Sequence, residues 1–282
     1  MNPGLENLET SMYYLMFAAY LLSMFSYWVW AAFKSELMGK LATALAIVGF
    51  AANTAAIVVR ILIVQRPPLT NGYEFLVTFC WGILAVYLFA EFRYRLKALG
   101  VFVLPVAFLL LAYIAMKMGP EERVAQAIPP ALKSQWLTFH VITAILAYGA
   151  FAVAFGLGLM YLLKHKFELL KKSDGLMTRF PALDTLDELA YRVVGFAFPL
   201  LSLCIITGAI WANYAWGTYW SWDPKETWSL ITWLIYAGYL HARLMYGWKG
   251  KRAAWMAVFG FAAVLFTFFG VNYFLPGLHT YA

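Results

Sequence analysis

Long apolar runs separated by short polar clusters form the main pattern of the chain. A helix needs roughly 20 mostly apolar residues to cross a hydrocarbon core of about 30 Å. The runs are continuous, whereas strands of an outer-membrane barrel would alternate apolar and polar positions. The sequence therefore predicts an all-α fold, a polytopic integral membrane bundle of about eight transmembrane helices. The expected spans are residues 12–33, 41–64, 73–92, 99–116, 136–163, 191–211, 227–246 and 253–274.

Composition agrees with this class. Of 282 residues, 63% are hydrophobic and 12% are charged, whereas soluble domains average about 45–50% and about 25%. An ordinary soluble enzyme is excluded, and residues 1–282 are expected to form a single membrane domain. Cys80 and Cys204 lie singly within apolar stretches, without the spacing of a metal or redox pair, and we interpret both as packing residues.

Basic residues are distributed unevenly between the two sets of loops. The loops after the first, third, fifth and seventh spans carry 13 Lys and Arg, and the opposite loops carry five. Because basic residues collect on the cytoplasmic side, this predicts both termini outside, external loops at 117–135 and 212–227, and a cytoplasmic loop at 164–190. The net charge of +7 then reflects topology, and no nucleic-acid partner is expected.

Tryptophans concentrate around one external loop. Residues 211–236 contain six of the 12 tryptophans in the chain. Trp and Tyr favour the membrane interface, which accounts for a few rings at each end of a span. Six in one connection exceed that need, and a wide apolar surface of rings suits a flat aromatic ligand held at the membrane surface.

The same loop contains a helix start. Asp223 is a favoured N-cap, Pro224 suits the first helical position, and Glu226 is placed to close a capping box. Asn71 and Glu74 repeat this pattern ahead of the third span. We therefore interpret Asp223 mainly as a helix-start residue, with any ligand contact secondary.

The segment 216–228, Trp-Gly-Thr-Tyr-Trp-Ser-Trp-Asp-Pro-Lys-Glu-Thr-Trp, resembles the WWD signature of haem-handling proteins. Trp233, the Tyr-Leu-His at 239–241, Arg60 and the segment 68–74 also fit, so the resemblance covers nearly the whole chain. It is a resemblance to the CcsA/ResC family of the system II pathway of cytochrome c maturation. It implies cofactor-binding residues in the loop, namely Trp216, Trp220, Trp222, Asp223 and Trp228.

Three histidines are candidate ligands of haem iron. His140 and His279 flank the external face that carries the tryptophans, and imidazole is a usual axial ligand. The resemblance matches them to the external haem-ligand pair of the family. His241 lies within the seventh span, where an ionisable group is a functional candidate, and it matches the intramembrane ligand. His165 sits between two lysines and is interpreted as part of a solvated basic flank.

Arg60 lies near the outer end of the second span. Its long side chain could extend to the lipid headgroups. Alternatively, its guanidinium could bind a haem propionate, because it matches a carboxylate in bidentate geometry. Both interpretations stay open at this point.

The resemblance implies that the chain moves or presents haem b in transit and supports its covalent attachment to the Cys-x-x-Cys-His motif of apocytochrome c. It further implies a CcsB/ResB-type membrane subunit that completes the inner haem site, so the chain would be part of a holocytochrome c synthase complex. Such a complex resides in the bacterial cytoplasmic membrane, or in the thylakoid membrane of a plastid or cyanobacterium. No acid–base pair or activated nucleophile is evident, so the chemical contribution would be positioning and redox protection.

Two other functions fit the residues. One is a transporter of another lipophilic substrate, such as a quinone, with the tryptophans as its docking surface. The other is a haem-bearing electron-transfer subunit. A permanent haem inside the bundle would need opposed histidines within the spans, and only His241 lies deep, which argues against that function.

Overall fold

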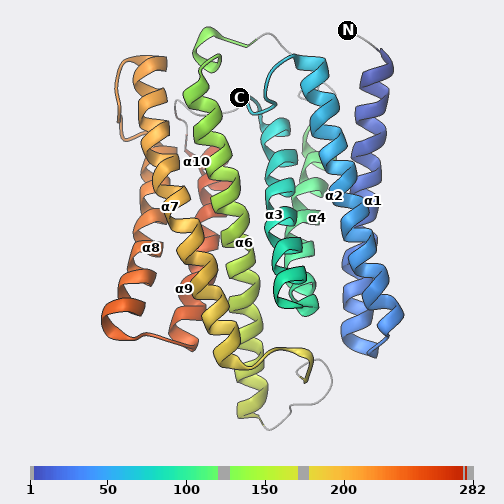
Figure 1. Ribbon diagram of the computed structural model, residues 1–282. Helices are drawn as coiled ribbons and strands as arrows, with labels where there is room; N and C mark the ends of the chain where they lie inside the picture. The colour runs from blue at the N-terminus through green and yellow to red at the C-terminus, as the bar shows by residue number, and fades with distance from the viewer. Residues whose placement is uncertain (1–2, 120–127, 171–177, 276, 278–282) are drawn as a thin grey trace. The chain divides into compact units, whose positions relative to one another are not determined.

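The computed structural model describes residues 3–119, 128–170, 178–275 and 277, and within these residues it contains helices and no strands (Figure 1). The chain divides into two compact units, residues 1–127 with 170–181, and residues 128–169 with 182–282. Seven of the described helices are long and apolar enough to cross a membrane. The prediction of a polytopic helical membrane protein is confirmed. The orientation of the termini stays a prediction.

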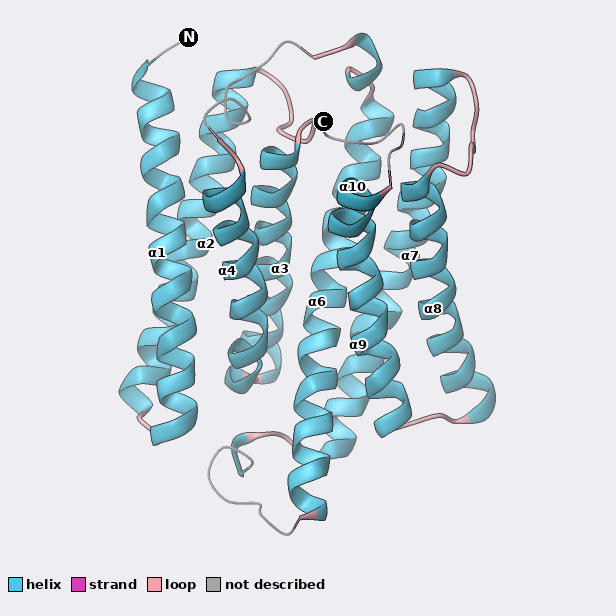
Figure 2. Ribbon diagram, turned by 180° about the vertical axis from the view of Figure 1, so that it is seen from behind, coloured by secondary structure: helices cyan, strands magenta, loops and turns pink. Residues whose placement is uncertain are grey.

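The first unit is built from α1 (Pro3–Phe33), α2 (Glu36–Val64), α3 (Gly72–Tyr94) and α4 (Gly100–Lys117), with a short 3-10 turn at Lys97–Leu99. The pairs α1 with α2 and α3 with α4 pack side by side, as the view from behind also shows (Figure 2). Small side chains at helical spacing allow α2 to approach its neighbours closely. They are Gly39, Ala42, Ala46, Gly49, Ala52 and Ala56.

The second unit contains α6 (Gln135–Leu169), α7 (Leu183–Trp216), α8 (Pro224–Tyr246) and α9 (Lys251–Leu265), preceded by a 3-10 turn at Pro130–Leu132. A π-helical segment, Phe266–Gly270, joins α9 to the short α10 (Val271–Phe274). The long α6 packs against α7 and α9, and α8 packs against α7 and α9. All the candidate cofactor-binding residues except Arg60 fall within the residue ranges of this unit.

The helices differ from the expected spans at several ends. The external loop expected at 212–227 is shorter, because α7 continues to Trp216 and α8 begins at Pro224. Residues 212–216 contain no glycine or proline, and Gly217 ends α7 in the left-handed conformation with φ of 82°. The helix α8 is as long as some of these seven but is not one of the candidate membrane-spanning helices. Polar and charged side chains recur along it and lower its mean hydropathy.

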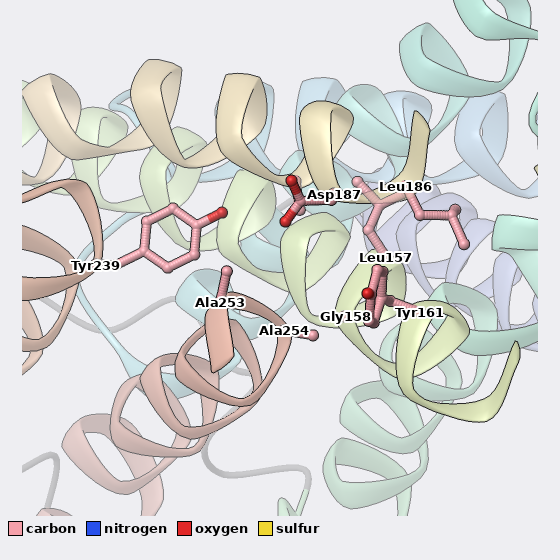
Figure 3. A pocket seen from close by; sticks show the side chains of 9 residues that line it. Leu157, Gly158, Tyr161, Leu186, Asp187, Tyr239, Ala253 and Ala254 are labelled. Carbon is pink, nitrogen blue, oxygen red and sulfur yellow. The ribbon is translucent and has the colours of Figure 1, made fainter. Parts of the chain in front are cut away.

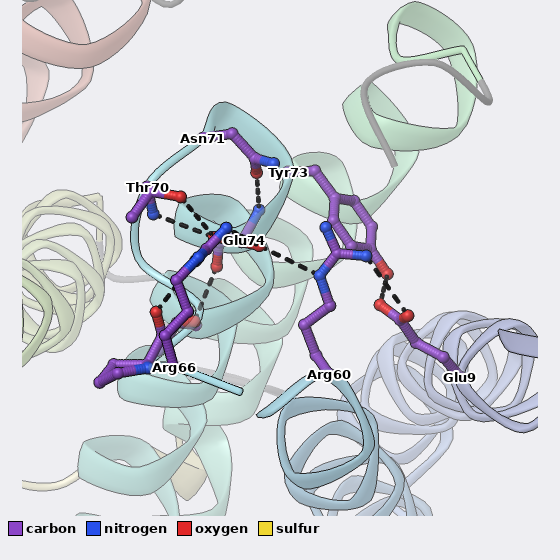
Figure 4. A network of polar contacts seen from close by, with 9 residues as sticks. Glu9, Arg60, Arg66, Thr70, Asn71, Tyr73 and Glu74 are labelled. Atoms are coloured by element: carbon purple, nitrogen blue, oxygen red, sulfur yellow. Dashed lines mark hydrogen bonds and ion pairs between the residues drawn. The ribbon is translucent and has the colours of Figure 1, made fainter. Parts of the chain in front are cut away.

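A buried ionic network stabilises one end of the first unit (Figure 4). Arg60 is 3% exposed, and its guanidinium lies 3.1 Å from a Glu74 oxygen and 3.5 Å from a Glu9 oxygen. Glu74 also accepts hydrogen bonds from Arg66 and from the backbone N–H of Thr70. Arg60 is therefore held between two carboxylates inside the unit and does not extend to the lipid headgroups, which was one of the two interpretations left open by the sequence.

We expect Arg60→Met to destabilise the protein by about 3–5 kcal/mol, because it leaves two buried carboxylates without their shared cation. The control is Arg192→Met, which breaks an exposed pair with Glu188 and should cost roughly 0–1 kcal/mol. Thermal unfolding in detergent compares the two. Equal midpoints for both variants would contradict a structural role for the Arg60 network.

Candidate functional site

The loop 217–223, called here the tryptophan loop, is tied to the first turn of α8 by two carboxylates. Asp223 accepts a hydrogen bond from the Lys225 backbone N–H at 2.9 Å. Glu226 accepts from the backbone N–H groups of Ser221 at 2.8 Å and of Asp223 at 3.2 Å. These contacts complete the capping box predicted from the sequence. Asp223 itself is 6% exposed, so its first role is structural.

The four candidate tryptophans fall into three groups. Trp220 and Trp222 contact each other edge to face in the loop, with ring centroids 5.7 Å apart. Trp216, the last residue of α7, packs edge to face on Trp211 at 5.0 Å. Trp228 lies in α8 and packs on Phe266 of the π-helical segment at 4.1 Å. The rings are thus distributed over the loop and both flanking helices.

Trp222 is the most exposed of these rings and has unusual backbone geometry. Its side chain is 68% exposed and its φ is 60°, in the left-handed region. For a residue other than glycine this conformation costs roughly 1–2 kcal/mol. Trp222 therefore combines a large exposed ring with a backbone conformation that favours glycine.

His140 is oriented by α7. Its Nδ1 lies 2.8 Å from the backbone oxygen of Cys204, and its ring stacks on Trp211 with an interplanar angle of 18°. Because a carbonyl oxygen only accepts, Nδ1 carries the proton in this bond, and the lone pair of the neutral ring is on Nε2. Gly208 makes room for the ring, since a Cβ there would lie 2.6 Å from Nδ1. Trp211 thereby links His140 to Trp216 in one aromatic cluster, which sequence reasoning did not identify.

The other two histidines are placed differently. His279 lies outside the described residues. Gly277, two residues before it, packs against Asp223 and Pro224 at the start of α8. His241 is exposed on α8 and contacts Tyr246 edge to face. The structure therefore groups His140 with the tryptophan cluster and leaves His241 on the outer surface of the second unit.

Lys225 is a further charged residue of the site that sequence reasoning passed over. It is half-buried in the first turn of α8, ahead of the expected span. Burial lowers its pKa from 10.5 to about 8, although the Asp223 carboxylate partly opposes that shift. The available signal was its position in the capping sequence, because Lys225 stands two residues after the N-cap Asp223 and so belongs to the first turn of the helix.

Comparisons with known proteins agree on one group. Residues 69–279 match the family model described as cytochrome C assembly protein. The chain is 37% identical to the cytochrome c biogenesis protein CcsA of Gloeobacter violaceus, covering 94% of this chain and 93% of that one. It is 38% identical to CcsA of Guillardia theta, covering 95% and 94%.

A solved structure shares the fold. The cytochrome c haem lyase CcmF superposes with a TM-score of 0.72 at 18% identity, covering 95% of this chain. The match covers 47% of the CcmF chain, so this chain spans about half of that protein.

The lowered pKa of Lys225 predicts a pH-dependent stability. Between pH 8 and 10.5 the folded protein releases this proton while the unfolded chain retains it, so stability should rise with pH across that window. Thermal midpoints measured across the window should rise less in Lys225→Met than in the parent. Lys133→Met, at an exposed lysine, is the control and should follow the parent. An identical slope in parent and Lys225→Met would refute the burial of this ammonium group.

Proposed function

The chain belongs to the cytochrome c assembly family and is a haem-handling membrane protein of cytochrome c maturation, and we propose that it presents haem to apocytochrome c at the tryptophan loop. The cargo is haem b, which becomes attached through thioether bonds to the thiols of a Cys-x-x-Cys-His motif. The chain supplies positioning for this chemistry. The WWD signature at 216–228 and the system II pathway are part of the same proposal.

The observation that carries the proposal is the geometry of His140. An axial ligand needs a neutral imidazole with one nitrogen fixed by a second partner. The hydrogen bond from Nδ1 to the Cys204 carbonyl meets this need and leaves Nε2 as the ligand atom. His279 is proposed as the second outer ligand, because the nearby Gly277 lies against the start of α8.

The tryptophans supply the apolar part of the site. Trp220 and Trp222 lie in the loop, Trp216 joins the cluster that holds His140, and Trp228 extends the aromatic surface into α8. Aromatic rings suit the faces and edges of a macrocycle, and the strained backbone of Trp222 supports a role in ligand contact. Asp223 acts through the helix start that fixes the loop.

Arg60 is proposed as a residue for a haem propionate. Its guanidinium already binds Glu9 and Glu74, and Glu74 is shared with Arg66. A propionate would therefore displace Glu9, the more distant carboxylate. Because a buried carboxylate without a cation is costly, the displaced Glu9 would have to take up a proton or turn to water.

An inner haem site is proposed at His241. The side chain faces away from the buried surface of α8, on the side that also exposes Leu234 and Met245. A ligand so placed is accessible to a residue of another membrane protein. We assign that second ligand to a CcsB/ResB-type subunit, in the bacterial cytoplasmic membrane or the thylakoid membrane.

Visible spectra test the outer ligands. The protein purified with its CcsB/ResB-type subunit should show a haem Soret band, and the double variant His140→Ala, His279→Ala should lose or shift it. His165→Ala is the control, because His165 stacks on Tyr161 away from the loop, and it should keep the parent band. Unchanged spectra together with normal cytochrome c maturation in cells would contradict the assignment.

A pair of glycine variants tests the orientation of His140. Gly208→Ala places a Cβ 2.6 Å from Nδ1 of His140, whereas Gly195→Ala on the same helix meets nothing within 4 Å. We expect Gly208→Ala to shift the reduction potential of bound haem and Gly195→Ala to keep the parent value, measured by redox titration. If Gly208→Ala matches the parent while His140→Ala does not, the α7 contacts do not orient the ligand.

A further inference from the structure

The buried face of α8 is polar along most of its length. Its buried residues are Thr232, Tyr236, Tyr239, Ala242 and Arg243, and Ala242 is the only apolar aliphatic residue among these five. The four polar positions follow one another at spacings of four, three and four residues, which places them in one line on the helix. From Thr232 to Arg243 this line, called here the α8 polar column, rises about 16 Å.

The two tyrosines are the unusual members of the column. Tyr236 is fully buried and Tyr239 is 2% exposed, yet neither hydroxyl has a hydrogen-bond partner among the described residues. Burying a hydroxyl without a partner costs roughly 1–3 kcal/mol. Phenylalanine would fill the same space without that cost, particularly at Tyr236, whose ring stacks on Phe151 at 3.6 Å. A structural role for the rings therefore leaves both hydroxyls unexplained.

One end of the column opens on a narrow pocket (Figure 3). Tyr239 and Asp187 line it, together with Leu157, Gly158, Tyr161, Leu186, Ala190, Ala253 and Ala254. Asp187 forms an ion pair with Arg243 and accepts a hydrogen bond from the Gly250 backbone N–H at 2.8 Å. The ion-paired carboxylate of Asp187 thus lies in the same pocket as Tyr239.

The other end approaches the tryptophan loop. Thr232 and Thr267 are joined by a hydrogen bond of 3.4 Å between their hydroxyls. Thr267 belongs to the π-helical segment 266–270, a distortion that is frequent at functional positions. Lys225 lies two turns before Thr232, on the same line of α8, and its pKa of about 8 supports proton exchange at this end.

We infer that the α8 polar column is a proton path between the pocket at Asp187 and the first turn of α8 at Lys225. A proton enters from water at the Asp187 carboxylate and leaves to water from the Lys225 ammonium. Between them each hydroxyl accepts one proton and donates another, and water carries the proton over the two helical turns between Thr232 and Lys225, so no tyrosine ionises and no net charge stays in the column. Because the tyrosine hydroxyls lack partners in this structure, transfer requires rotation of the hydroxyls and entry of water beside Tyr239. A pH difference across the membrane drives the proton transfer.

Proton flux into sealed vesicles tests this path. The full chain is reconstituted into vesicles of phosphatidylethanolamine and phosphatidylglycerol that contain a pH-sensitive dye, with potassium and valinomycin to clamp the voltage. After an external acid pulse, parent vesicles should acidify faster than protein-free vesicles. Tyr236→Phe and Tyr239→Phe should return the rate to that of protein-free vesicles. Tyr14→Phe, at an exposed tyrosine of α1, should keep the parent rate.

Thermal unfolding distinguishes lost flux from a lost fold. Removing an unpaired buried hydroxyl should leave the unfolding midpoint of both Phe variants equal to the parent or higher. A stable variant without flux supports the path. Parent flux equal to that of protein-free vesicles overturns it, as does parent flux retained in the Tyr236→Phe, Tyr239→Phe double variant. Haem spectra of the same samples report separately on the proposed haem site, since neither reading depends on the other.

Discussion

The capping box formed by Asp223 and Glu226 sets the residue at which α8 begins, and the placement of every functional side chain of α8 depends on that register. With the helix starting at Pro224, Thr232, Tyr236, Tyr239 and Arg243 face the interior. His241 then faces outward. A shift of one residue would rotate each of these side chains by about 100°. The same two carboxylates hold the backbone of the tryptophan loop, so loop geometry and helix register are fixed together.

Around this start the site combines rigid and strained parts. The His140 ring is held by a backbone carbonyl, by Trp211 and by the space above Gly208, all contributed by one face of α7. Trp222 instead occupies a strained backbone position and is largely exposed. The proposed presentation of haem would use both parts, the fixed imidazole as a ligand and the exposed ring as an apolar surface.

Much of the fold could be predicted, because apolar periodicity and capping are local properties. The runs of apolar residues gave the helices, and Asp223 and Glu226 predicted the start of α8 correctly. The continuation of α7 to Trp216 was missed, because aromatic density was interpreted as loop, although only Gly217 breaks the helix. The membership of His140 in a cluster with Trp211, and the pairing of Arg60 with Glu9, required tertiary contacts. No local pattern encodes contacts between helices far apart in sequence.

The proposed function depends most on the binding of haem to Nε2 of His140 at the tryptophan loop. Electron cryo-microscopy of the haem-loaded complex tests it directly. We expect haem iron at bonding distance from Nε2 of His140, with the macrocycle against Trp220 and Trp222 and with the hydrogen bond from Nδ1 to the Cys204 carbonyl retained. Haem density elsewhere in the complex, with none against His140 and the tryptophan loop, would contradict it.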